Sequence, residues 1–271
     1  MFETLLAETD GALGRLTLSR PDKLNPLSTQ ALAEIAEAAR WFDAQPEVKV
    51  VIVGGQGRAF SAGADLSTFS GGSPGPSNAK PKVGSARSDQ LSTREAADLG
   101  RAMADRLEAM RALSIARIQG WCVGGGVVLA AACDLRIAAE DARFSIPEVD
   151  LGIPLAWGGI PRLVREIGPA LTKELVLTCR PFDAQEAKAV GFVNRVVPPD
   201  ELDEKVEEFA HSLARKARHT LVSTKQHVNA VTDQMVGTVR SWADADGLVT
   251  AFGDPECDEV RRQYLRERKS D

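Results

Sequence analysis

The chain has 271 residues, of which 44 % are hydrophobic and 26 % are charged, a balance that is typical of a globular protein and excludes a disordered or fibrous chain. Its length is sufficient for one large domain or for a domain with a smaller appendage. Because the formal net charge is −5, we expect no nucleic acid as the main partner, since a phosphate backbone selects for a basic surface.

The first fifty residues predict strands and one helix. Residues 2–7 and 13–18 alternate apolar and polar side chains around an Asp-Gly dipeptide, which predicts an antiparallel hairpin with a tight turn. Alanine-rich helical periodicity after a capping serine predicts a helix over 31–40. The continuous β-branched run over 48–53 predicts a strand that is buried on both faces.

The middle of the chain continues the alternation of strands and helices. Gly, Ser, Pro and Lys dominate residues 67–89, which predicts a loop. A long amphipathic helix is predicted over 91–113, followed by short strands over 114–119, 134–139 and 193–197. The recurring order of strand, strand and helix predicts an α/β core.

The last quarter of the chain has helical patterns and no strand pattern. Charged amphipathic helices are predicted over 201–217, 220–232, 234–250 and 257–269. We place a boundary at Pro198-Pro199, so that 1–198 forms the α/β core and 199–271 forms a helical C-terminal region. Helices with so little core of their own usually pack onto a partner subunit or back onto the main core.

No segment predicts a membrane span, a secretory signal or a metal site. The longest nearly apolar run, 121–133, is too short and too rich in glycine to cross a bilayer. The N-terminus carries an acidic residue early and no long apolar stretch. The four cysteines show neither a CxxC pair nor metal-ligand spacing, which is typical of reduced thiols. We therefore expect a cytoplasmic protein without membrane contact or bound metal.

Two segments rich in glycine and other small residues each follow a predicted strand. The first is 60–66, with the sequence Phe-Ser-Ala-Gly-Ala-Asp-Leu, and the second is 120–130, with three consecutive glycines. Small residues let a ligand approach the backbone, and a glycine run that opens a helix leaves unpaired N–H groups directed at that ligand. Such a site favours developing negative charge. Each segment alone is more typical of tight packing, and neither has the spacing of a Rossmann fingerprint or a P-loop.

These two segments, together with two others, resemble the crotonase superfamily, the enoyl-CoA hydratase/isomerase family. The others are 20–27, with the sequence Arg-Pro-Asp-Lys-Leu-Asn-Pro-Leu, and the stretch from 144 to 159. All four occur in the family's order and spacing and cover roughly residues 1–200, so their combination is more specific than any one of them. The resemblance implies an α/β fold, a spiral of ββα repeats with a C-terminal helical trimerisation region, and a homotrimer or a hexamer built as a dimer of trimers.

The resemblance also implies an acyl-CoA thioester as substrate, so coenzyme A is part of the substrate and no separate cofactor is expected. The backbone N–H groups of Ala64 and Gly125 would form an oxyanion hole for the thioester enolate. Glu148 occupies the position of a catalytic glutamate, and an apolar pocket raises a carboxyl pKa toward the working pH. The substrate-binding residues implied by the family pattern are Lys23, Leu24, Ala62, Ala64, Asp65, Leu66, Gly124, Gly125, Pro147, Glu148 and Trp157.

Two departures from the family pattern bear on the reaction. Enoyl-CoA hydratases of the family carry a second glutamate where this chain has Val128, and dienoyl-CoA isomerases carry an aspartate where it has Ala156. One carboxylate is sufficient to move a proton from C2 to C4 of a 3-enoyl-CoA. The pattern therefore favours isomerisation to 2-enoyl-CoA over efficient hydration. An enoyl-CoA hydratase in fatty-acid metabolism and a catalytically weak acyl-CoA-binding protein stay open as alternatives.

Several polar residues have a functional and a plain surface interpretation. Arg20, Lys23 and Arg58 are candidates for the phosphates of coenzyme A, and ordinary solvated surface explains each of them equally well. Asp150 is close to Glu148 in sequence, but it lies where the family has no catalytic acid.

The apolar residues that follow Glu148 have two interpretations as well. Leu151, Ile153, Leu155 and Trp157 can line an acyl pocket or belong to the core. The sequence leaves both interpretations open.

A serine hydrolase and a histidine-based site have less support. The one G-x-S-x-G match, at 71–75, falls within the loop predicted over 67–89 and not at a strand-to-helix turn, so the sequence predicts no nucleophile elbow. Its three histidines, His211, His219 and His227, all fall in the helical C-terminal region, and their eight-residue spacing places them on about one face only if the helix is continuous. We favour solvated surface histidines.

Overall fold

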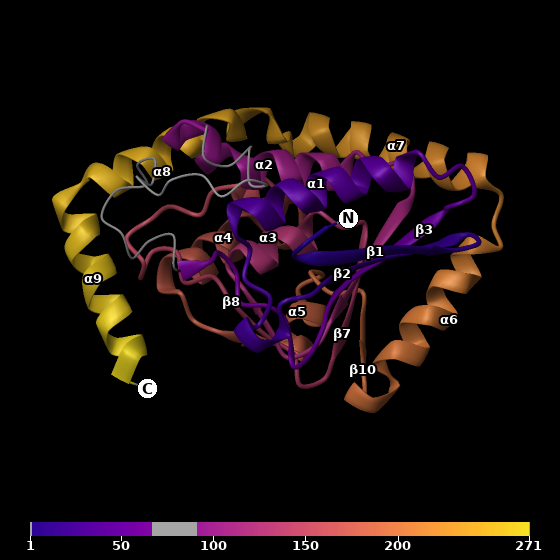
Figure 1. The fold of residues 1–271 in the computed structure, drawn as a ribbon, viewed down its shortest axis with the longest axis horizontal. Coiled ribbons are helices and arrows are strands. Elements are labelled where there is room, and N and C mark those ends of the chain that lie inside the picture. The colour runs from indigo at the N-terminus through magenta and orange to yellow at the C-terminus, as the bar shows by residue number, and fades with distance from the viewer. Residues whose placement is uncertain (1, 67–90, 271) are drawn as a thin grey trace.

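The computed structural model of the protein describes residues 2–66 and 91–270. The loop predicted over 67–89 lies outside these described residues. Strands and helices alternate as far as residue 197, and in the described chain after it only helices follow (Figure 1). The predicted boundary at Pro198-Pro199 lies directly after residue 197.

The larger of two β-sheets has six strands, and its first two form the predicted hairpin. β1 and β2 pair antiparallel from Leu5 with Leu18 to Asp10 with Leu13, and Gly11 makes the turn with a φ of +55°. Each further strand is parallel to its neighbour. In sheet order the strands are β1 (Leu5–Asp10), β2 (Leu13–Leu18), β3 (Val50–Gly55), β5 (Leu113–Ile118), β7 (Leu135–Ala139) and β10 (Arg195–Val197).

The smaller sheet has four short strands, of which the first three are parallel. Its last strand pairs antiparallel with the third. In sheet order they are β4 (Ala59–Ser61), β6 (Trp121–Val123), β8 (Arg143–Ser145) and β9 (Phe182–Asp183).

Helices connect the two sheets in a regular order. After β3 and β4 comes α2 (Thr93–Glu108), after β5 and β6 comes α3 (Gly125–Ala131), and after β7 and β8 comes α4 (Gly159–Thr178). Each turn of the chain therefore adds one strand to each sheet and then a helix, which confirms the predicted spiral of ββα repeats. Because β4 and β6 are parallel neighbours, the segments that follow them leave the same edge of the small sheet.

The core lies on both faces of the large sheet. One face packs against α1 (Thr29–Asp43), α2 and α3 in the largest apolar cluster. The predicted capping serine is Ser28, whose Oγ accepts from the N–H of Ala31. The other face is covered by α6 (Leu202–Ala214), which buries Leu202 and Val206 against strand residues such as Ile115. The C-terminal region thus packs back onto the core, one of the two predicted arrangements.

The C-terminal helices differ from the prediction in their breaks. Residues 234–250 were predicted as one helix, which is wrong. α7 (Arg218–Val236) ends at Val236, and the extended backbone of Gly237 leads into η5 (Thr238–Ala243) and α8 (Asp244–Gly253). α6 and α7 are also separate, because Ala217 is extended. His211 therefore does not share one continuous helix with the other two histidines.

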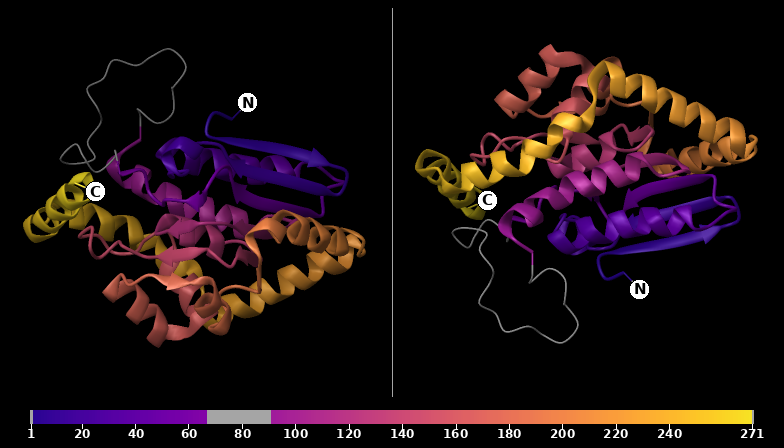
Figure 2. Two further views of the ribbon diagram at one scale, coloured as in Figure 1. Left: turned by 90° about the horizontal axis from the view of Figure 1, so that it is seen from below. Right: turned by 90° about the horizontal axis from the view of Figure 1, so that it is seen from above.

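The remaining elements complete the described chain. α9 (Pro255–Ser270) lies at one end of the molecule, and the turn of the β1–β2 hairpin lies at the other (Figure 2). The short elements are η1 (Pro21–Lys23), α5 (Ala184–Ala189) and η4 (Pro199–Glu201). In the described residues, no helix is both long and apolar enough to cross a membrane.

Candidate active site

The first backbone donor of the site is the N–H of Ala64, in the segment that follows β4. Leu27 donates its N–H to the carbonyl of Gly63 at 2.8 Å and accepts from the N–H of Asp65 at 3.2 Å. In a trans peptide the C=O and the N–H point in opposite directions. Since the Gly63 carbonyl faces Leu27, the N–H of Ala64 in the same peptide group faces away from it. Ala64 lines a pocket.

The second donor is the N–H of Gly125, the first residue of α3. The first N–H groups of a helix have no partner inside the helix. Gly124 precedes it with a φ of +49° and donates its own N–H to the carbonyl of Ser145. A Cβ atom on Gly63 would lie 2.5 Å from the Val123 oxygen and 3.4 Å from the Gly125 nitrogen. The two donor segments therefore touch.

Glu148 follows β8 and brings a carboxyl group to the same place. Its side chain is 8 % exposed, and its Oε2 atom has no hydrogen-bond partner among the described residues. Burial raises the pKa of this carboxyl to about 7. A Cβ atom on Gly124 would lie 2.4 Å from Oε1, so only glycine there lets the carboxyl lie beside the second donor.

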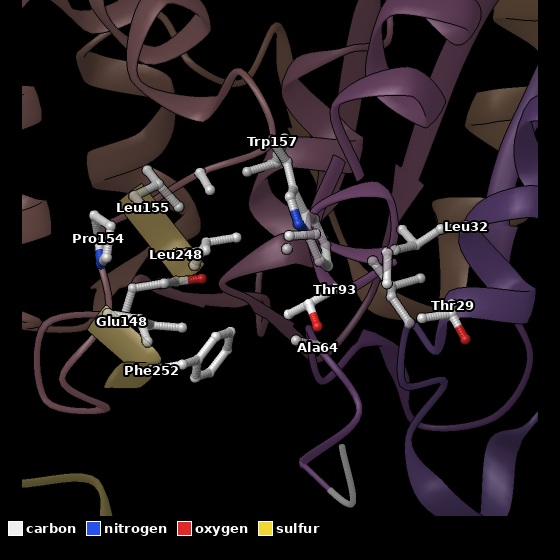
Figure 3. Close-up of a pocket in the computed structure, with 17 residues that line it drawn as sticks. Thr29, Leu32, Ala64, Thr93, Glu148, Pro154, Leu155, Trp157, Leu248 and Phe252 are labelled. Carbon is white, nitrogen blue, oxygen red and sulfur yellow. The ribbon is translucent and has the colours of Figure 1, made fainter. Parts of the chain in front are cut away.

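These groups line one largely apolar pocket, whose empty space including its open mouth is about 810 Å³. Figure 3 shows the Glu148 carboxyl directed into the pocket, with Trp157 near its centre. Among the described residues that line it, Glu148 is the single ionisable one. The lining residues are Leu27, Thr29, Leu32, Ala64, Thr93, Ala96, Ala97, Gly125, Val128, Glu148, Ile153, Pro154, Leu155, Ala156, Trp157, Leu248 and Phe252.

Trp157 packs against two glycines on different helices. A Cβ atom on Gly100 of α2 or on Gly125 of α3 would lie 2.0 or 2.2 Å from its ring. The residue itself has a φ of +61°, which is rare for a residue with a side chain. The indole therefore lies directly beside the second backbone donor.

Val128 and Ala156 occupy the places where the family pattern would add an acid. Both line the pocket, and Val128 is 1 % exposed. The Cγ2 atom of Val128 would lie 2.9 Å from a Cβ atom on Gly159. The wall beside Glu148 is therefore filled with hydrocarbon at both positions.

The structure brings together part of the predicted site. Ala64, Gly125, Glu148 and Trp157 line the pocket together, and so do Ile153 and Leu155 of the expected acyl wall. Leu151 instead belongs to an apolar cluster with α8 residues. The other predicted substrate-binding residues lie outside the pocket lining, and they are Lys23, Leu24, Ala62, Asp65, Leu66, Gly124 and Pro147.

The basic candidates for phosphate binding divide into two groups. Arg20 lies 3.1 Å from the carboxylate of Asp65, so this guanidinium already has an acidic partner. Lys23 and Arg58 are exposed and remain candidates for phosphate binding.

The acidic residue Asp150, two residues after Glu148, is also exposed and does not line the pocket.

Several pocket residues were not predicted from the sequence. Apart from Leu27 and Pro154, they come from helices α1, α2 and α8, whose apolar positions serve the core and the pocket alike. No local pattern separates Leu248 and Phe252 of α8 from core residues of the same helix. The unpredicted lining residues are Leu27, Thr29, Leu32, Thr93, Ala96, Ala97, Pro154, Leu248 and Phe252.

Comparison with known proteins gives one consistent result. The family model described as enoyl-CoA hydratase/isomerase matches residues 8–271. A crotonyl-CoA hydratase of Syntrophomonas wolfei is 32 % identical over 270 residues, which are 99 % of this chain and 97 % of that protein. A probable enoyl-CoA hydratase of Mycobacterium bovis is 36 % identical over 84 % of this chain and 82 % of its own length. A peroxisomal Δ(3,5)-Δ(2,4)-dienoyl-CoA isomerase of Arabidopsis thaliana is 37 % identical over 83 % of this chain and 80 % of its own.

Solved structures agree with the sequence relatives. An enoyl-CoA hydratase from Mycobacterium avium subsp. paratuberculosis superimposes with a TM-score of 0.81 at 26 % identity, covering 96 % of this chain and 98 % of that one. An enoyl-CoA hydratase subunit from Geobacillus kaustophilus has a TM-score of 0.73 at 32 % identity, and the match covers 100 % of this chain and 91 % of that one. With the ββα spiral and the family match over nearly its whole length, this chain belongs to the enoyl-CoA hydratase/isomerase family of the crotonase superfamily and is an enzyme of the lyase or isomerase class.

Proposed function

We propose that this enzyme converts 3-enoyl-CoA thioesters into 2-enoyl-CoA thioesters, with Glu148 as the acid/base group. One observation carries the proposal: among the described residues, Glu148 is the single ionisable side chain in an apolar pocket that two backbone donors reach. An isomerisation by proton transfer needs one such group. A hydration also needs a water molecule held and polarised, usually by a second acid.

The proposed reaction moves one proton and two electron pairs. The carboxylate of Glu148 removes a proton from C2, and the electron pair of that C–H bond enters the thioester to give a dienolate. The N–H groups of Ala64 and Gly125 hold the resulting oxyanion. The protonated Glu148 then donates its proton to C4, the C3–C4 double bond shifts to C2–C3, and the thioester carbonyl is restored. Loss of one such donor typically lowers a rate by about 10²–10³.

The pKa of Glu148 suits both halves of this cycle. With a pKa of about 7, the group is ionised in a large fraction of molecules near neutral pH and can accept a proton. It is also a stronger base than an exposed glutamate, and its conjugate acid still donates to C4. Its partnerless Oε2 atom leaves the carboxyl available for substrate.

Hydration of a 2-enoyl-CoA is the second candidate. The crotonyl-CoA hydratase of Syntrophomonas wolfei aligns with 99 % of this chain, which favours it. The apolar wall at Val128 opposes it, because a water molecule placed there has no second carboxylate to orient it.

We further propose that the predicted residues outside the pocket lining hold the coenzyme A part of the substrate. Lys23 and Leu24 belong to the turn at η1, and Leu24 accepts the N–H of Ala62 at 2.7 Å. Exposed Lys23 beside this turn supplies a positive charge for a phosphate.

The first prediction concerns the proton shuttle. Replacing Glu148 by Gln keeps the size of the side chain and removes its ability to take a proton, so we expect isomerisation of a 3-enoyl-CoA to fall by at least about 10²-fold. The dissociation constant for the thioester should change little. Product formation is followed by chromatography, and a variant that retains wild-type activity would refute the role of Glu148. Tight binding by the wild type without either reaction would instead support an acyl-CoA-binding protein.

The second prediction concerns stability against pH. The raised pKa means that folding favours the protonated carboxyl, so the fold loses stability as the pH rises from about 4.5 to about 7. The full cost is present above pH 7, and none of it is present well below pH 4.5. The pKa of Glu148 rises from the usual 4.5 to about 7, and each pH unit of this difference corresponds to about 1.36 kcal/mol, so keeping the carboxyl ionised lowers the free energy of unfolding by about 3 kcal/mol. Urea unfolding at pH 5 and pH 8 should show Glu148→Gln gaining stability over the wild type mainly at pH 8. If the two proteins differ in unfolding free energy by the same amount at pH 5 and at pH 8, the pKa of Glu148 is not raised.

The third prediction concerns hydration. Val128→Glu places a second carboxyl in the pocket wall, and we expect hydration of crotonyl-CoA to rise by about tenfold or more, since a missing acid or base commonly costs about 10²–10⁴. Val128→Gln is the matched control, because it has the same shape and no acid. If both substitutions change the hydration rate equally, or if Val128→Glu gives no gain, a carboxyl at this position does not help to hold the attacking water, and the prediction is wrong.

We also propose that the protein is a homotrimer or a hexamer. Apolar side chains are exposed along α7 and η5, and both elements lie within the C-terminal helical region, 199–271, for which the family resemblance implied trimerisation. Met235 and Val239 have 77 % and 83 % of their surface exposed, more than a soluble monomer usually tolerates in one cluster. The exposed side chains of this group are Val228, Val231, Met235, Val239 and Trp242.

The fourth prediction tests this assembly. Met235→Glu combined with Val239→Glu places two charges in the proposed interface, so the particle should dissociate toward the 29.0 kDa chain in light scattering after size exclusion. Leu6→Glu, at an exposed apolar position of β1, is the control and should leave the mass unchanged. A wild type that already runs as a monomer would contradict the proposal.

A further inference from the structure

The segment that carries Ala64 belongs to no helix and no long strand. β4 ends at Ser61, and the chain then runs through Gly63, whose φ is +82°. Glycine has no Cβ to restrict its backbone, so it adopts this and other conformations readily. The Leu27 N–H holds the Gly63 carbonyl at 2.8 Å, and with it the peptide group that carries the Ala64 N–H, so the remaining freedom lies in the peptide group that precedes Gly63. A restraint on that group must come from neighbouring side chains.

Ser61 provides such a restraint. Its side chain is fully buried, its Oγ donates to the carbonyl of Asn25 at 2.8 Å, and the same Oγ accepts from the N–H of Gly63 at 3.1 Å. A Cβ atom on Gly126 would lie 3.0 Å from the Ser61 Cβ and 3.3 Å from its Oγ. Ser61 thus lies between the two donor segments and holds the peptide group that precedes Gly63.

Asn25 anchors the other end of this contact. It is 1 % exposed and has a φ of +54°, a conformation that asparagine tolerates better than most residues. Its Oδ1 accepts from the N–H of Arg20, and its Nδ2 donates to the carbonyls of Gln56 and Ala59, both at 2.9 Å. The side-chain amide is therefore well satisfied, and the segment around Asn25 is fixed to the turn between β3 and β4.

We propose that Ser61 and Asn25 are positioning residues for the oxyanion hole: through the bonded chain Asn25, Ser61, Gly63 they set the direction of the Ala64 N–H. This inference rests on the proposed function, because it assumes that this N–H binds the thioester oxygen. Neither residue lines the pocket. Both act through the backbone that they hold.

The expected defect follows from the geometry. Without the Ser61 hydroxyl, the N–H of Gly63 loses its acceptor, and the hydrogen bond from Leu27 to the Gly63 carbonyl is left to hold the Gly63–Ala64 peptide group alone, so the direction of the Ala64 N–H becomes less precise. The full loss of a donor costs about 10²–10³ in rate, so Ser61→Ala should lower kcat by about 10- to 100-fold. KM should stay within about threefold, since most of the thioester contacts remain.

A bound chromophore gives a readout that does not depend on turnover. The thioester 4-(dimethylamino)cinnamoyl-CoA absorbs at longer wavelength when donors polarise its carbonyl oxygen. We expect a red shift on binding to the wild type and a clearly smaller one in Ser61→Ala at similar affinity. Ser61→Cys, a weaker donor and acceptor of similar size, should give an intermediate shift.

Ser114→Ala is the matched control. Ser114 is equally buried, its Oγ donates to the Asp134 carboxylate and accepts from the Asp134 N–H, both at 2.9 Å, and it joins β5 to the start of β7 away from the pocket. It should lose comparable stability and keep the full shift. A full shift and full kcat in Ser61→Ala, or an equal loss in both serine variants, would overturn the inference. A wild type that binds no enoyl-CoA or shows no shift would overturn the proposed function as well.

Discussion

The close approach of two glycine-containing segments is the constraint on which the site depends. β4 and β6 are parallel neighbours in the small sheet, so the chain leaves both strands at the same edge. A Cβ atom on Gly63 would overlap the Val123 carbonyl at 2.5 Å. Only a residue without a side chain therefore lets the N–H groups of Ala64 and Gly125 serve one oxygen atom, and every later step of the proposed chemistry needs that convergence.

The same packing gives Glu148 its chemical character. Its carboxyl lies over Gly124, largely shielded from water, and its Oε2 atom has no partner among the described residues. An unpaired buried acid is costly when it is ionised, which is why its pKa rises. The fold thus gives up stability at neutral and higher pH at the position where the proposed reaction needs a base, in a pocket whose other lining residues carry no charge.

The sequence predicted what local patterns encode. The hairpin, the helix after Ser28 and the order of the ββα repeats depend on short-range periodicity and turns, and the structure has them. The family resemblance predicted Ala64, Gly125, Glu148 and Trp157 as site residues, and all four line one pocket in the structure. The α8 wall with Phe252 was not predicted, because an apolar helix position looks the same whether it faces a core or a cavity. The ion pair of Arg20 with Asp65 was not predicted either, because it joins residues far apart in sequence and no local pattern indicates such a contact.

Trp157 shows how distant elements support the proposed oxyanion hole. A positive φ at a residue with a side chain costs on the order of 1–3 kcal/mol and persists only where its surroundings fix it. Here Asp244 of α8 accepts the N–H of Gly158 at 2.8 Å, and Arg162 donates to the Gly158 carbonyl at 3.2 Å. The turn held in this way presses the indole against Gly125. Because the ring covers one side of that donor, the proposed hydrogen bond from the Gly125 N–H to an enolate oxygen would form in a less polar setting and be stronger there.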